Sequence, residues 1–170
     1  MVYSMVVRKA GVLSYLYLTG DGHPDDDFYI KLPSPMFIYE MVTGKMLGVD
    51  DHVEGKIRDG EAKVFALSPS PTKELSVQAG KTTYSRGERV SLDFNLTTQD
   101  GKPGDRLIMI KYNAGKEGIL PAIPRTLMLN NGKGQLQFLI PYNASLGKFE
   151  LTAKDLTSGN GSNIWIEVSR

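Results

Sequence analysis

The sequence predicts an all-β chain of two antiparallel β-sandwich domains in tandem. Eighteen glycines and nine prolines divide the apolar residues into short runs of strand length, with turn residues between them. Apolar residues do not recur at the i, i+3, i+4 and i+7 positions that a helix requires. The segment Ser68-Pro-Ser-Pro71 cannot lie inside a sheet and favours an extended, exposed connector. We therefore expect domains at residues 1–68 and 73–170, joined by a Pro/Ser linker at 69–72.

The first domain should consist of strands separated by polar turns. Residues 12–18 are apolar on both faces, which is typical of a central strand. Asp59-Gly60 lies between two apolar runs and predicts a hairpin. The expected strands are residues 3–7, 12–18, 28–32, 36–41, 46–47, 52–57 and 62–67.

The second domain shows the clearest alternation of apolar and polar residues. Val90, Leu92, Phe94 and Leu96 share one face of a strand whose other face is polar. Strands are expected at residues 75–79, 89–97, 106–112, 125–129, 134–140, 147–154 and 163–168. About seven short alternating strands in about 100 residues predict an immunoglobulin-like sandwich. The Cys–Trp–Cys core of antibody domains is absent, because the chain contains no cysteine.

Composition excludes several classes of function. The formal net charge is +1, and no run of lysine and arginine offers a basic face, so we expect no nucleic-acid partner. Without cysteine there is no thiol catalysis, thiolate metal site or disulfide. No apolar run reaches the roughly 20 residues that span a bilayer. The start of the chain reads as a strand rather than a signal peptide, so we expect it to begin part-way through a longer gene product.

Four carboxylates near turns are candidates for acid–base catalysis. They are Asp50, Asp51, Glu54 and Glu61. A glycosidase needs two carboxyl groups facing each other about 5–9 Å apart, with one in surroundings that raise its pKa. Carboxylates near turns are ordinarily solvated, so we predict no catalytic residue.

The histidines and the acidic loop are candidates for metal binding. His23 and His52 lack the spacing of a zinc site, and both are predicted to be surface residues. The loop over 21–27 carries Asp21, Asp25, Asp26 and Asp27, whose oxygens suit calcium. It lacks the regular spacing of a calcium loop, so a solvated loop is favoured and cation binding stays an alternative. No cofactor and no metal ligand are predicted.

Aromatic residues on one strand face can form a platform for sugar rings. Trp165 is the best candidate, because it lies opposite the core-facing Ile164 and Ile166. Tyr112 and Tyr142 would join it only if the fold brings them close. The alternative is an isolated exposed tryptophan, or one that covers a domain junction.

Two stretches of the first domain, a hairpin and a later strand with its turn, together carry a resemblance to a known family. They are Ile38-Tyr-Glu-Met-Val-Thr-Gly-Lys-Met-Leu-Gly48 and Asp59-Gly-Glu-Ala-Lys-Val-Phe-Ala-Leu67. This pattern resembles the small C-terminal β-sandwich of many bacterial glycoside hydrolases, although Glu40 stands where aspartate is usual. The second domain, with Gly104-Asp-Arg-Leu107, is similar to immunoglobulin-like or macroglobulin-like accessory domains. The tandem order resembles β-galactosidase-like proteins. The resemblance implies an upstream catalytic domain, no catalytic residue in this segment, and an extracellular or periplasmic location.

The predicted function is a non-catalytic structural or accessory segment of a larger, carbohydrate-active protein. Its partners would be the upstream domain of the same polypeptide and, as an alternative, a polysaccharide. A carbohydrate-binding module that uses exposed aromatics is the main alternative function. A small hydrolase is the second, and it would need convergent carboxylates in a cleft.

Overall fold

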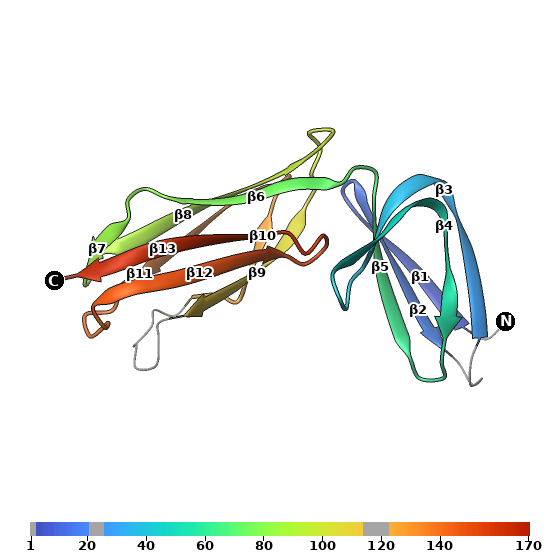
Figure 1. The fold of residues 1–170 in the computed structure, drawn as a ribbon, viewed down its shortest axis with the longest axis horizontal. Helices are drawn as coiled ribbons and strands as arrows, with labels where there is room; N and C mark the ends of the chain where they lie inside the picture. The colour runs from blue at the N-terminus through green and yellow to red at the C-terminus, as the bar shows by residue number, and fades with distance from the viewer. Residues whose placement is uncertain (1–2, 21–25, 114–122) are drawn as a thin grey trace.

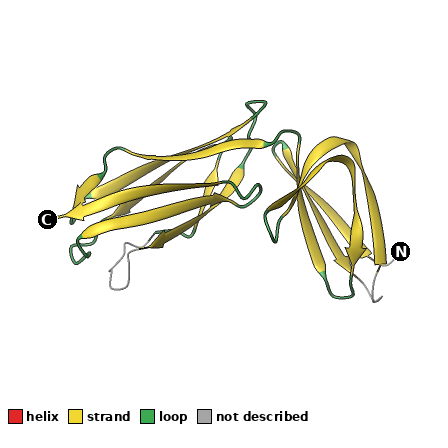
Figure 2. Cartoon of the chain, viewed as in Figure 1, coloured by secondary structure: helices red, strands yellow, loops and turns green. Residues whose placement is uncertain are grey.

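The computed structural model of the chain describes residues 3–20, 26–113 and 123–170, and all of their regular structure is β-strand (Figure 2). Within these residues no helix is long and apolar enough to cross a bilayer. The strands form two lobes, β1 to β5 near the N-terminus and β6 to β13 toward the C-terminus (Figure 1). We call them the N-terminal and the C-terminal sandwich. The predicted all-β class with two tandem sandwiches is confirmed.

The N-terminal sandwich is built from one antiparallel sheet of five strands in the order β1-β2-β5-β3-β4. The strands are β1 (Tyr3–Ala10), β2 (Leu13–Gly20), β3 (Asp26–Glu40), β4 (Lys45–Ile57) and β5 (Ala62–Ser68). The sheet folds over itself, so that one face encloses a core. The buried core residues are Leu16, Leu18, Phe28, Leu32, Ile38, Val53, Ile57, Phe65 and Leu67.

Strand β3 differs from the expectation of two separate strands at 28–32 and 36–41. It runs continuously for 15 residues and includes Pro33 and Pro35. The β3–β4 register shifts between Lys31 and Met36, so the prolines lie where the hydrogen-bond ladder is already interrupted. This irregularity bends the hairpin: residues 37–40 of β3 stay paired with β5, while the rest of β3 and β4 arches away from β1, β2 and β5 (Figure 1). The bend therefore produces two layers from a single sheet.

The C-terminal sandwich contains two facing sheets, one in the order β10-β9-β12-β13-β7 and one in the order β11-β8-β6. Its strands are β6 (Thr72–Ala79), β7 (Thr83–Ser85), β8 (Arg89–Thr98), β9 (Arg106–Asn113), β10 (Thr126–Leu129), β11 (Lys133–Leu139), β12 (Gly147–Asp155) and β13 (Gly161–Ser169). All seven expected strands are present. The additional strand β7 pairs in parallel with β13.

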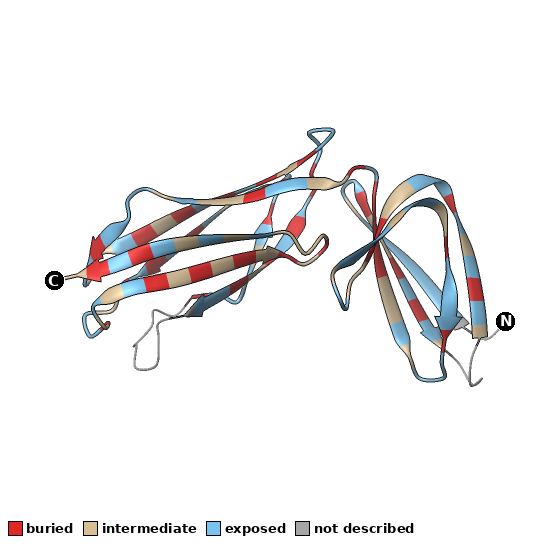
Figure 3. Cartoon of the chain, in the orientation of Figure 1, coloured by how far each residue is buried: buried red, intermediate tan, exposed pale blue. Residues whose placement is uncertain are grey.

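Alternating burial along the strands of the C-terminal sandwich confirms the immunoglobulin-like prediction. Val90, Leu92, Phe94 and Leu96 of β8 are buried, while the residues between them are at least partly exposed. In Figure 3 buried residues alternate with partly exposed ones along β12, and with exposed ones toward the end of β13. These inward side chains form one contiguous apolar core between the two sheets.

The connector between β5 and β6 is not the exposed segment that was expected. Ser68 and Ser70 are buried, although Pro69 between them is exposed. The Ser68 hydroxyl donates to the Ser70 carbonyl at 2.6 Å, and the Asp100 amide donates to the Ser70 hydroxyl at 3.1 Å. The connector is therefore fastened to the C-terminal sandwich. The boundary at residues 69–72 itself stays a prediction.

We expect Leu92→Ala to lower the free energy of unfolding of the C-terminal sandwich by about 2–5 kcal/mol, because Leu92 is fully buried and its truncation leaves a cavity. Leu139→Ala is the matched control, since Leu139 is 49% exposed and its loss should cost about 0.5 kcal/mol or less. Urea denaturation of both variants measures the difference. Equal losses would contradict this assignment of the core face.

Candidate functional site

The two sandwiches meet at a buried ion pair. Arg106 at the start of β9 and Asp155 at the end of β12 both have fully buried side chains, with Arg106 Nη1 3.7 Å from Asp155 Oδ2. Arg106 Nε donates to the carbonyl of Pro103 at 2.8 Å. Asp155 accepts hydrogen bonds from the backbone amides of Thr157 and Ser158 at 3.2 and 3.1 Å. The aspartate thus closes the β12–β13 turn and also balances the arginine charge.

The N-terminal sandwich contributes two tyrosines to this junction. Tyr39 of β3 is buried, hydrogen-bonds the backbone of Thr72 and lies within the electrostatic influence of the ion pair. Burial raises the pKa of Tyr39, so the phenol stays neutral. The hydroxyl of Tyr15, on β2, lies 3.5 Å from Thr157 Oγ1. Side chains of both sandwiches therefore enclose the ion pair.

Glycines allow the two backbones to approach closely at the junction. Gly104 has φ +65°, and a Cβ there would lie 2.6 Å from a methyl group of Val12. Gly159 has φ +76°, and a Cβ there would lie 2.9 Å from the carbonyl oxygen of Gly44. Any larger residue at either position would force the sandwiches apart. The junction is therefore tightly packed rather than loosely apposed.

A second polar cluster surrounds His52 on β4. His52 Nδ1 lies 2.7 Å from Asp50 Oδ1 and 3.1 Å from Asp51 Oδ1, and Nε2 lies 3.9 Å from Glu54 Oε2. The imidazole stacks on Tyr29 of β3, with the ring centroids 4.9 Å apart. His52 is thus a partly exposed histidine within an ion-pair network, which the expectation of a surface histidine did not include.

The cluster does not resemble a general acid or a buried metal site. The hydrogen bond between Asp51 and His52 lowers the pKa of Asp51 and raises the pKa of His52. One ligand atom each from Asp50, Asp51 and His52 falls within 4.8 Å of the others, but the carboxylates are about half exposed. Exposed acidic groups of this kind are common without a bound ion. The network joins β3 and β4 next to their register shift.

The other candidates are less informative. The backbone amide of Arg58 donates to Glu61 at 2.9 Å and lowers the pKa of this carboxyl group, whereas a catalytic acid needs a raised pKa. Asp27, at the start of β3, lies 3.9 Å from Lys56 Nζ. Residues 21–25, which hold His23 and most of the acidic loop, lie outside the described residues. The solvated loop, with cation binding as its alternative, therefore stays a prediction.

The three aromatic candidates do not share one face. Trp165 is 55% exposed on the outward face of β13, directly opposite Glu150 of β12. Tyr112 of β9 is instead opposite the buried Leu151, on the inward face of the same sheet. Tyr142 follows β11, and its ring covers Gly87. Only Trp165 is presented on the outward face of this sheet, and sugar contact by any of the three stays a prediction.

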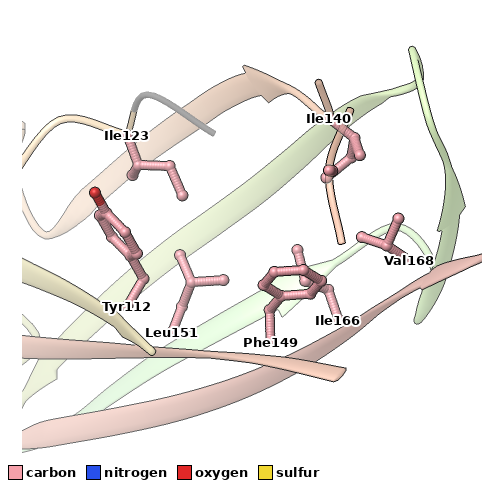
Figure 4. A pocket seen from close by; sticks show the side chains of 8 residues that line it. Tyr112, Ile123, Ile140, Phe149, Leu151, Ile166 and Val168 are labelled. Carbon is pink, nitrogen blue, oxygen red and sulfur yellow. The ribbon is translucent and has the colours of Figure 1, made fainter. Parts of the chain in front are cut away.

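Tyr112 borders a small cavity inside the C-terminal sandwich. In Figure 4 its ring lies beside Ile123 and Leu151, with Phe149, Ile166 and Val168 further along the cavity. The cavity measures about 10 Å³ and its lining is apolar. Ligand pockets typically measure about 300–1,000 Å³, so this space is a packing defect and not a binding site.

Comparisons with known proteins identify the fold and no family. No family model matches the sequence, and no curated protein matches it either. Among solved structures, the Yersinia pseudotuberculosis adhesin InvE matches 99% of this chain with a TM-score of 0.51 and 14% sequence identity. This chain spans 59% of the adhesin chain, which is less than two thirds. A Salmonella alpha-2-macroglobulin mutant matches 99% of this chain and 16% of its own, with a TM-score of 0.45 and 10% identity. The likeness to the adhesin shows a shared arrangement of β-sandwiches.

We expect Arg106→Met to destabilise the protein by about 3–5 kcal/mol, because it leaves the charge of Asp155 buried and unpaired. Asp155→Asn keeps an acceptor for the Thr157 amide and removes that charge. The double variant should therefore be more stable than Arg106→Met alone by about 1 kcal/mol or more. A double-mutant cycle by urea denaturation tests this coupling, and additive losses would contradict it.

Protonated His52 should stabilise the fold at low pH. Its folded pKa is raised above the ordinary value of 6.5, so this contribution is complete below pH 6.5 and is lost as the pH rises through the folded pKa. The stability advantage of the wild type over His52→Gln should therefore shrink as the pH rises above 6.5 and through the raised folded pKa. An NMR titration of the His52 ring should give a midpoint above 6.5 that falls in Asp51→Asn. An unchanged midpoint would contradict the role of Asp51.

Proposed function

We propose that this chain is a non-catalytic accessory segment that holds neighbouring domains of a larger protein in a fixed orientation. The observation that supports this function is the packed junction around Arg106 and Asp155. A flexible linker between domains would be solvated and free of tertiary contacts. Here Ser68 at the end of β5 and Ser70 in the connector are buried, and both sandwiches contribute side chains to one polar core.

Reorienting the sandwiches would be costly. Separating the two sandwiches would expose the buried Tyr39 to water. It would also remove the packed surroundings of the buried charges on Arg106 and Asp155. The close contact of Gly104 with Val12 would be lost in the same movement. Because one movement of the two sandwiches apart would break all of these contacts, the proposal requires the segment to behave as a single rigid body.

The resemblance to accessory domains of bacterial glycoside hydrolases supports a carbohydrate-active parent protein as the context. In such a protein, residues 1–68 and 73–170 are separate domains joined at 69–72, and the N-terminal sandwich contacts the upstream domain. The fold shared with an adhesin agrees with a role in which sandwiches act as spacers. Both points support a brace more than a hydrolase.

Spin-label distances test the rigidity directly. The chain has no cysteine, so Thr19→Cys on β2 and Thr126→Cys on β10 place one label on each sandwich without background. Both residues are exposed. We expect one narrow distance distribution between the labels. Gly104→Val should broaden this distribution, because its side chain would clash with Val12 across the junction.

The control pair places both labels in the C-terminal sandwich, at Thr126 and Asn143, and should stay narrow in both backgrounds. A broad distribution between Thr19 and Thr126 in the otherwise unmodified chain would rule out the brace.

A further inference from the structure

Trp165 is exposed among polar residues, and the proposed role as a brace gives no reason for this exposure. It is the only tryptophan of the chain and occupies the middle of β13, away from the junction residues Asp155 and Thr157. Its indole is 55% exposed on the outward face of the sheet. A groove of about 550 Å³ borders the ring and is lined by Thr82, Lys148, Trp165, Ile166 and Glu167. The ring is therefore accessible from solvent and borders this groove.

Hydrogen-bonding groups flank the indole on its own face. Glu150 is its direct cross-strand partner, and Asn163 and Glu167 are its same-face neighbours along β13. Lys148 of β12 is the cross-strand neighbour of Glu167 in the β12–β13 register. Cross-strand neighbours have Cβ atoms about 4.5–5.5 Å apart, so these groups stand within reach of a molecule that covers the ring.

Hydrogen bonds hold the Glu150 side chain and the Thr82 backbone in position before any ligand arrives. Asn163 Nδ2 donates to Glu150 Oε1 at 3.1 Å, which restricts the carboxylate of the cross-strand partner of Trp165. The backbone amide of Glu167 donates to the carbonyl of Thr82 at 2.8 Å, which places the Thr82 segment against the edge of the groove. Preorganised polar groups around an exposed aromatic ring reduce the entropy cost of binding.

We infer that this face of β12 and β13 is a subsite for one neutral pyranose unit of a polysaccharide. A pyranose has an apolar C–H face that stacks on an indole and a rim of hydroxyl groups that donate to carboxylates. Glu150 and Glu167 accept from these hydroxyls, and Lys148 donates to a hydroxyl or ring oxygen. With Lys148 included, the three charged groups leave one net negative charge beside the ring, which disfavours uronates and sulfated sugars.

The single tryptophan reports occupancy of this subsite without any label. The intact chain is titrated with cellohexaose, mannohexaose and trigalacturonate, and Trp165 fluorescence is recorded. We expect a saturable change with at least one neutral oligosaccharide and a weaker response, or none, with trigalacturonate.

Affinity electrophoresis compares variants in gels that contain hydroxyethylcellulose, galactomannan or polygalacturonate. Trp165→Ala should weaken retardation by a neutral polymer about tenfold or more, Trp165→Phe should weaken it less, and Glu150→Gln should weaken it by a few fold. Tyr29→Ala is the matched control, because Tyr29 is 58% exposed but lies on the N-terminal sandwich. Thermal unfolding of each variant establishes that it is folded.

Three results would overturn the inference: no retardation of the wild type by either neutral polymer, unchanged retardation of Trp165→Ala, or stronger binding to polygalacturonate than to the neutral polymers. The subsite is independent of the brace, since each of these results leaves the spin-label distances unchanged.

Discussion

The buried pair of Arg106 and Asp155 is the constraint on which the arrangement of the two sandwiches depends. Removing two charges from water costs several kcal/mol for each ion, and their attraction offsets this only in favourable geometry. Here Arg106 Nη1 and Asp155 Oδ2 lie 3.7 Å apart, and within the described residues neither Nη atom of Arg106 has a hydrogen-bond partner. Even this separation requires β9 and β12 to stay paired and the β12–β13 turn to stay closed by Asp155. It also requires Tyr39 of the other sandwich to cover the site. One ion pair thus links the internal register of one domain to the position of its neighbour.

Local patterning predicted the strands of the C-terminal sandwich well, because each strand has one face toward a single core. Elements whose structure depends on distant contacts were predicted less well. The prolines of β3 indicate a strand end by the usual rule, yet β4 has a register shift at the same place and the strand continues. Strand β7 has three residues, too few for a period of two to be recognised. The burial of Ser70 depends on Asp100, 30 residues later.

The same division applies to the candidate sites. Alternation within β13 predicts that Trp165 points outward, because Ile166 is buried, and the structure agrees. Alternation within β9 cannot show whether Tyr112 lies on the same face of the sheet as Trp165. That depends on how β9 pairs with β12, where Tyr112 is opposite Leu151. For His52 a signal was present in the sequence: Asp50 and Glu54 are each two residues away and therefore share its face of a strand. The ion pair at the junction had no such signal, because 49 positions separate its members along the chain.

The direction of the strands also determines how the C-terminal sandwich carries tension. Its first strand enters at the junction and its last strand, β13, ends at the opposite pole, so both run along the length of the lobe (Figure 1). A pull between the two ends therefore acts along β13, against an antiparallel neighbour, β12, on one side and a parallel one, β7, on the other. The hydrogen bonds of both ladders lie across that pull and are loaded in shear at the same time. Peeling the strand away one bond after another would need a sideways force, so a sandwich connected in this way resists stretching along its length.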